Sequence, residues 1–210
     1  MSQLETTSGL LDDLQKLVRG SVDWQACRPR ILARLKAARQ NIHDHALEVL
    51  RDTNDGLLCA KTISDGHDRL LVAICQLVAE QIKGGWPTSI SVLATGGYGR
   101  GELAPGSDLD LLFLVKTEAL ANENEWIERV LYLLWDMGLK IGPAVRTPAQ
   151  CRKLAGEDHT IATSMMDLRV LFGSAKSGEA LLKSLTKKQT ANSKRQFIAD
   201  KLAERDQRHQ

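Results

Sequence analysis

The stretch LATGGYGRGELAPGSDLDLLFLV, residues 93–115, constrains the fold of this 210-residue chain more than any other segment. It contains five glycines between positions 96 and 106. Because glycine is costly inside helices and strands, the backbone is expected to turn sharply or to approach another group closely there. Apolar runs flank the glycines, ISVLA at residues 90–94 and LDLLFLV at residues 109–115. The pattern predicts two buried strands joined by a glycine-rich connection, with the second strand central in its sheet.

Helical patterns surround these strands. Apolar residues recur at helical spacing from Leu4 to Ile82, and KGGWPTS then ends the pattern. Residues 123–138 predict a further helix that Gly138 closes, and residues 139–147 predict a third strand, which Pro143 would place at an edge. From Pro148 onward the pattern is again helical, including residues 159–173.

The predicted fold class is therefore α/β, a small mixed sheet flanked by helical regions on both sides in the sequence. We predict an N-terminal helical region over residues 1–85, a core with the sheet over residues 86–175 and a C-terminal helical region over residues 176–210. The last predicted helix reaches Gln210 without a glycine or proline stop, so we expect a truncated chain.

Composition restricts the kind of partner. The chain has 28 Lys and Arg against 26 Asp and Glu, a net charge of +2, which predicts no nucleic-acid binding. The four cysteines lack the paired spacing of zinc ligands, so buried reduced thiols are expected. The N-terminus has no apolar leader and no segment is apolar enough to span a membrane, which predicts a cytoplasmic protein without membrane contact.

Two acidic residues stand where the second strand begins. Asp108 and Asp110 are two positions apart, and alternate residues of a strand project from the same face, so both carboxylates should point to one place. Two neighbouring carboxylates repel each other, and Mg²⁺ relieves this repulsion while it keeps positions for phosphate oxygens. The pair therefore predicts a magnesium site.

The glycine-rich segment supplies groups that suit a triphosphate. Gly96 and Gly97 leave backbone N–H groups open to phosphate, Ser107 adds a hydroxyl and Arg100 adds positive charge. A D-x-D pair or a glycine pair alone is weak evidence, because most such patterns are solvated pairs or simple turns. Found together between two strands, they predict transfer of a nucleotidyl group.

The segment GGYGRGELAPGSDLDLLFLV resembles the signature of the DNA polymerase β type nucleotidyltransferase superfamily. In its full form, G-G-Y-G-R-G-E-L-x-P-x-S-D-x-D-L, it is similar to bacterial PII uridylyltransferases, the bifunctional uridylyltransferase and uridylyl-removing enzymes of nitrogen control. The similarity extends into residues 132–147, 160–173 and 197–209. The sheet core is thus identified as a nucleotidyltransferase core.

The resemblance implies a reaction and its residues. It implies that Asp108 and Asp110 ligate Mg²⁺, that Gly96, Gly97 and Ser107 hold the triphosphate of UTP, and that the acceptor is a tyrosine hydroxyl of the PII regulator. The superfamily often supplies a third carboxylate from the next strand, but residues 139–147 contain none. Either two carboxylates suffice or an acid such as Asp167 approaches from a helix.

The resemblance also leaves alternatives open. The family's HD-type phosphohydrolase domain and its two ACT domains are absent from these 210 residues. The chain could be a related nucleotidyltransferase with another nucleotide or acceptor, or an inactive regulatory or binding fragment of the same fold.

Several further residues have ordinary structural interpretations. Trp126, Tyr132 and Trp135 have helical spacing and are expected in the core. In SDGHDRLL, Ser64 or Asp65 is expected to cap a helix. Asp167 and Arg169 could line the cleft or form a surface pair, and helix patterning favours neither.

Overall fold

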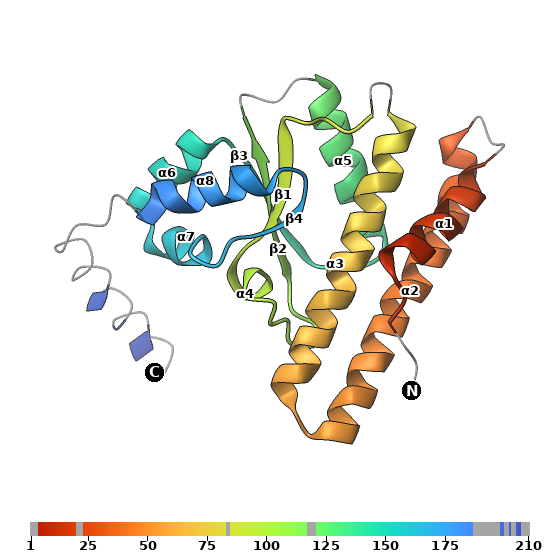
Figure 1. Cartoon of the computed structure of the whole chain (residues 1–210), viewed down its shortest axis with the longest axis horizontal. Coiled ribbons are helices and arrows are strands. Elements are labelled where there is room, and N and C mark those ends of the chain that lie inside the picture. The colour runs from red at the N-terminus through yellow and green to blue at the C-terminus, as the bar shows by residue number, and fades with distance from the viewer. Residues whose placement is uncertain are drawn as a thin grey trace.

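The computed structural model describes residues 4–19, 23–82, 85–116, 121–186, 198–199, 202 and 205–206. Three helices come first, and a region that mixes helices and strands follows (Figure 1). In order they are α1 (Thr7–Val18), α2 (Trp24–Thr53), α3 (Gly56–Gln81), β1 (Ile90–Ala94), α4 (Gly96–Gly99), β2 (Leu109–Val115), α5 (Ala121–Asp136), β3 (Ile141–Arg146), α6 (Pro148–Glu157), α7 (His159–Ser164), β4 (Arg169–Phe172) and α8 (Ala175–Thr186).

The four strands form one mixed sheet in the order β3-β2-β1-β4. Strand β1 runs antiparallel to both β2 and β4, whereas β2 and β3 are parallel. Strand β2 is interior, as its apolar run predicts, and β3, which contains Pro143, lies at an edge. The predicted α/β class with a small mixed sheet is confirmed.

Alternating residues of β2 separate the two faces of the sheet. Leu111 and Phe113 belong to a core shared with α3 and α5, while Leu112 and Leu114 pack with residues of α6 and α8. Figure 1 shows α3 and α5 on one side of the sheet and α6, α7 and α8 on the other. Both faces are therefore covered by helices.

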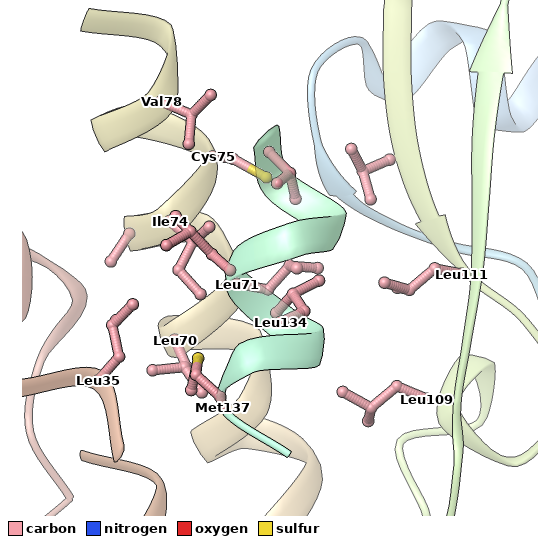
Figure 2. Packing of buried hydrophobic residues seen from close by; sticks show 14 of the residues in the cluster. Leu35, Leu70, Leu71, Ile74, Cys75, Val78, Leu109, Leu111, Leu134 and Met137 are labelled. Carbon is pink, nitrogen blue, oxygen red and sulfur yellow. The ribbon is translucent and has the colours of Figure 1, made fainter. Parts of the chain in front are cut away.

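One hydrophobic core joins the N-terminal helices to the sheet. Figure 2 shows Leu35 of α2 beside α3, and α3 and α5 meeting side chains that project from β2. The same cluster continues to Leu10 and Leu14 of α1. The division of the chain at residue 85 stays a prediction, and this core extends across it.

The structure corrects the secondary structure expected for residues 159–173. Only His159–Ser164 is helical there, and Arg169–Phe172 is strand β4. Strand β4 pairs with the outer edge of β1, where Ala94 lies opposite Arg169 and Val92 opposite Phe172. Hydrogen bonding to this edge accounts for an extended conformation in an apolar run that is too short to reveal its own periodicity.

Two interpretations of single residues were wrong. Neither Ser64 nor Asp65 caps a helix, because both lie within α3, whose N-cap Asp55 accepts a hydrogen bond from the Leu58 N–H at 2.9 Å. Tyr132 and Trp135 are outside the core, with 53% and 45% of their surface exposed.

Two further expectations, for Trp126 and for the cysteines, are confirmed. Trp126 is fully buried, and all four cysteines are buried free thiols. Throughout the described residues, no helix has the length and apolar character needed to cross a membrane. Helix α8 falls at the start of the predicted C-terminal helical region, whose bounds stay a prediction, and most of residues 187–210 lie outside the described residues.

Candidate active site

The two predicted acids lie where β2 begins. Asp110 is the second residue of the strand and is half-buried, while Asp108 precedes the strand and is exposed. The backbone holds Asp110 firmly, because its carbonyl accepts a hydrogen bond from the Thr95 N–H at 3.0 Å and it pairs with Gly142 of β3. Between the two acids, Leu109 projects into the opposite core. Asp110 therefore shares the sheet face of Leu112, toward α6, α7 and α8.

Two glycines make room for the Asp110 carboxylate. A Cβ at Gly142 would lie 2.8 Å from Oδ1, and a Cβ at Gly96 would lie 3.0 Å from Oδ2. Gly96 also has φ +58°, a backbone conformation that side chains disfavour. A side chain at position 142 would therefore force the Asp110 carboxylate to shift from its present position.

The electrostatics of the acid pair favour a cation. Burial raises the pKa of Asp110, and the neighbouring charge of Asp108 raises it further. Among the described residues, no Lys, Arg or His forms an ion pair with either carboxylate. The fold thus places two acids together, and within the described ranges no ion pair offsets their repulsion.

The predicted glycine turn contains the short helix α4, which follows β1 directly. Its first backbone N–H groups have no acceptor within the helix, and the side chain of the N-cap Thr95 bonds to none of them. A Cβ at Gly97 would make only ordinary contacts, 3.5 Å from the Glu102 carbonyl oxygen and 3.7 Å from Arg100. A Cβ at Gly99 would lie 1.9 Å from the backbone oxygen of Asp167. Gly99 is therefore required for packing, whereas Gly97 is not.

The other predicted site residues lie around this turn. Arg100 follows α4 and forms ion pairs with Asp167 at 3.1 Å and with Glu102 at 3.6 Å. Its side chain is half exposed. Ser107 closes a turn in which its N–H donates to the Ala104 carbonyl at 3.0 Å, and its side chain is exposed one residue before Asp108.

Asp167 does not join the acid pair. It approaches the glycine turn through Arg100 and Gly99. In the part of the chain that the structure describes, no three His, Cys, Asp or Glu side chains form a group that could hold a metal ion. Any cation at Asp108 and Asp110 would have to complete its coordination with water or substrate oxygens.

A cavity of about 310 Å³ adjoins Asp110. It lies between the sheet and α7, and its volume falls at the lower end of the range for small-molecule sites, about 300–1,000 Å³. Its polar lining includes Thr95 at the glycine turn, Arg146 at the far end of β3, and Thr160 and Ser164 on α7. The cavity thus places the Asp110 carboxylate in one space with hydroxyl groups and a guanidinium.

The sequence did not identify one cluster beside the site. Arg169 of β4 bonds to Asp68 and Ser64, which are four residues apart on α3. Arg169 and Asp167 do not form the surface pair that the sequence suggested, because Arg169 bonds to Asp68 and Asp167 pairs with Arg100. That they line the cleft stays a prediction. The available signal was the pair of polar residues at i and i+4 beside the apolar stripe of α3.

Comparison with known proteins identifies a family and a relative that this chain resembles. Residues 75–161 match the nucleotidyltransferase domain family, and this range includes the glycine turn, both acids and β3. The chain is also 35% identical over 206 residues to the bifunctional uridylyltransferase/uridylyl-removing enzyme of Azospirillum brasilense. That alignment covers 95% of this chain and 22% of the relative, so the chain spans about a fifth of the relative's length.

A solved structure described as the crystal structure of the toxin-antitoxin with AMP-PNP aligns with 55% of this chain and 87% of its own. The TM-score is 0.35 and the sequence identity 15%, a likeness too weak to support an argument about either fold or function.

Proposed function

The chain carries a nucleotidyltransferase domain, and we propose that this domain transfers UMP from UTP to a tyrosine hydroxyl of the PII nitrogen-regulatory protein in a Mg²⁺-dependent reaction. The observation that carries the proposal is the acid pair Asp108 and Asp110 beside the open amides of the glycine turn. The identity to a uridylyltransferase supports uridylyl as the transferred group.

Asp108 and Asp110 fit Mg²⁺ because they offer hard oxygen ligands whose mutual repulsion a cation would relieve. When bound there, Mg²⁺ supplies positive charge to the triphosphate and lowers the pKa of a coordinated hydroxyl. The backbone N–H groups of Gly96 and Gly97, together with the Ser107 hydroxyl, would bind phosphate oxygens. The cavity lined by Thr160, Ser164 and Arg146 would receive the nucleoside.

The transfer itself is an in-line displacement. The tyrosine oxygen forms a bond to the α-phosphorus, the bond from that phosphorus to the bridging oxygen of the β-phosphate breaks, and pyrophosphate leaves while the hydroxyl proton passes to solvent. The residues of this chain position the triphosphate and exclude part of the water. None of them needs to become covalently attached to the nucleotide.

The test is incubation of the chain with PII, Mg²⁺ and one of UTP, ATP, CTP or GTP, followed by intact-mass measurement of PII. We expect the mass of each modified PII subunit to increase by one uridylyl group when the nucleotide is UTP, and not with ATP, CTP or GTP. The increase should vanish with the Asp110→Asn variant and with a PII variant whose acceptor tyrosine is phenylalanine.

Each other outcome identifies an alternative. Transfer from a different nucleotide would replace uridylyl with that group. If Mg²⁺ and UTP bind but no nucleotide is transferred to PII, the chain is an inactive binding fragment and the proposed activity is wrong.

A further inference from the structure

A single guanidinium connects the N-terminal helices to the glycine turn. Arg169 is the first residue of β4, and its two terminal nitrogens both donate to the Asp68 carboxylate, one of them at 3.2 Å to Oδ1. The same side chain donates to the Ser64 hydroxyl at 3.2 Å. Ser64 is fully buried, whereas the Arg169 and Asp68 side chains are 34% and 22% exposed, so the cluster lies at the edge of the packed face of α3.

The remaining hydrogen bonds of Arg169 go to the glycine turn. Nη2 donates to the Tyr98 carbonyl at 3.0 Å and Nε donates to the Gly99 carbonyl at 3.3 Å. The guanidinium carbon also lies 5.5 Å from the centre of the buried Tyr98 ring, within cation–π range. Arg169 therefore holds the last two residues of α4 to α3.

The glycine turn needs such an external support. Helix α4 has four residues, three of them glycine, and a helix this short gains little stability from its own hydrogen bonds. The carbonyls at the end of a helix lack partners within it. Arg169 donates to the Gly99 carbonyl, and it adds a second donor to the Tyr98 carbonyl, which also accepts from the Gly101 N–H at 3.0 Å. The amides of Gly96 and Gly97 are one to three residues away from the carbonyls that Arg169 holds.

The chemistry of this contact requires arginine. Burial opposes the charge of Arg169, but the hydrogen bonds and charge of Asp68 outweigh burial, so the pKa of Arg169 is raised. A planar fork can bond to a carboxylate and to two carbonyls at once, whereas a lysine ammonium cannot reproduce that geometry. Because Ser64 and Asp68 precede residue 75, they lie outside the range that matches the nucleotidyltransferase family.

We propose that Arg169 and Asp68 are positioning residues for the nucleotide, which fix the glycine turn so that the Gly96 and Gly97 amides face the triphosphate. Helix α3 is then part of the nucleotide site although it contributes no ligand. The inference rests on the proposed function for the identity of the nucleotide, but the placement of the turn can be measured without any nucleotide.

The experiment compares Arg169→Lys and Asp68→Asn with the control Arg34→Lys in the 210-residue chain. Arg34 is also a half-buried arginine with two acidic partners, Glu5 and Asp13, but these contacts lie among α1, α2 and the segment before α1. For each protein we would measure the melting temperature, amide hydrogen exchange of residues 95–103, the dissociation constant for UTP with Mg²⁺, and kcat and KM for transfer.

We expect Arg169→Lys and Asp68→Asn to speed exchange over residues 95–103 at least tenfold without nucleotide and to weaken UTP binding at least tenfold. KM for UTP should rise more than kcat falls. Arg34→Lys should lower only the melting temperature. If Arg169→Lys fails to fold, Ser64→Ala removes one hydrogen bond from the same cluster, and a smaller change in the same exchange and affinity measurements is expected.

Unchanged exchange over residues 95–103 in the Arg169 and Asp68 variants would overturn the inference, as would equal effects in Arg34→Lys. Failure of the wild-type chain to bind or transfer UTP would instead contradict the proposed function. In that case the exchange measurement alone would still decide whether Arg169 and Asp68 position the turn.

Discussion

Among the described residues, no basic side chain forms an ion pair with the Asp110 carboxylate. Its pKa is raised by burial and by Asp108, and the nearby glycines only provide space for its carboxylate. We predict that Asp110→Asn lowers transfer more than about 100-fold, because a lost metal ligand costs several kcal/mol of transition-state stabilisation. The variant should fold, since asparagine has nearly the same volume.

The same variant tests the metal directly by thermal melting. Mg²⁺ should raise the melting temperature of the wild type, because it binds the folded state and relieves the repulsion of the acids. Asp110→Asn should lose this increase, while Asp52→Asn, a change at an exposed acid of α2, should keep it. An equal response of all three proteins to Mg²⁺ would contradict the metal assignment.

Gly97 and Gly99 should respond differently to the same substitution. In Gly97→Ala the new methyl group makes only ordinary contacts at 3.5 Å and 3.7 Å, so the fold should tolerate it. The methyl group should, however, hinder the approach of a phosphate group to the backbone N–H groups of the turn. In Gly99→Ala the methyl group would lie 1.9 Å from the Asp167 backbone oxygen, so the turn or β4 must move.

We predict that Gly97→Ala weakens UTP binding at least tenfold with little change in melting temperature, measured by calorimetry and thermal melting. Gly99→Ala should lower both the affinity for UTP and the melting temperature, and overpacking should reduce the free energy of unfolding by about 1–3 kcal/mol. Similar losses of stability in the two variants would assign Gly97 a purely structural role in the turn.

His67 should make stability depend on pH. Burial lowers its pKa, and the hydrogen bond between Nδ1 and the Ile63 carbonyl, 2.9 Å, offsets this only in part. A group whose pKa is depressed in the folded state binds fewer protons than in the unfolded state. Its contribution is therefore complete above the ordinary histidine pKa of about 6.5 and is lost as the pH falls below it.

We predict that the free energy of unfolding of the wild type falls between pH 7.5 and 5.5 more steeply than that of His67→Asn, measured by urea denaturation. His43→Asn is the matched control, because the His43 side chain is 50% exposed on α2. Equal slopes for the wild type and His67→Asn would show that His67 does not contribute.

Sequence patterns could identify residues that act through local spacing, but not those that act through distant contacts. Asp108, Asp110 and the glycine pair could be proposed from the sequence because their chemistry is evident within a single segment, and their roles stay predictions. The role of Gly142 depends on the register between β2 and β3, which no local pattern specifies. Asp68 and Arg169 are 101 residues apart, and only the folded chain brings them together.

At the scale of helices and strands, a long apolar pattern was sufficient to predict an element from the sequence. The interior strand β2 and the long helices were predicted because their apolar patterns are long and continuous. Strand β4 was missed because it has four residues and follows α7 after a short turn, so its apolar residues extended the helical pattern. Its strand conformation comes from pairing with β1 rather than from local preference.

The contact between α2 and α3 depends on a glycine. A Cβ at Gly66 would lie 2.5 Å and 2.7 Å from the Ile42 Cγ2 and Cγ1 atoms. Alanine would raise helix propensity by about 1 kcal/mol, but separating the two helices costs more. We predict that Gly66→Ala lowers the free energy of unfolding by about 1–3 kcal/mol, measured by urea denaturation.

The control for this prediction is to introduce Gly66→Ala into a protein that already carries Ile42→Ala, because that substitution removes the Ile42 Cγ1 and Cγ2 atoms. There, Gly66→Ala should become neutral or stabilising, so the two substitutions should show a coupling free energy larger than about 0.5 kcal/mol. The same loss in both backgrounds would mean that Ile42 does not limit the approach of the helices.

At the scale of the whole molecule, the continuous core determines how the chain unfolds. The cluster that contains Leu35 of α2 also contains Leu71 of α3 and Leu111 of β2 (Figure 2). Elements that share one core usually unfold together. We therefore expect a single unfolding transition that includes the N-terminal helices and the sheet.

The variant that tests this is Leu35→Ala, because Leu35 is fully buried on α2 and the substitution should cost about 2–5 kcal/mol. In one cooperative unit, that loss must appear equally in the slowest-exchanging amides of α2 and of β2, measured by hydrogen exchange in low denaturant. Leu57 lies near the start of α3 and its side chain is 51% exposed, so Leu57→Ala should leave the exchange of the amides in both α2 and β2 unchanged. If exchange in β2 keeps its wild-type free energy while α2 loses stability, the helices and the sheet unfold independently.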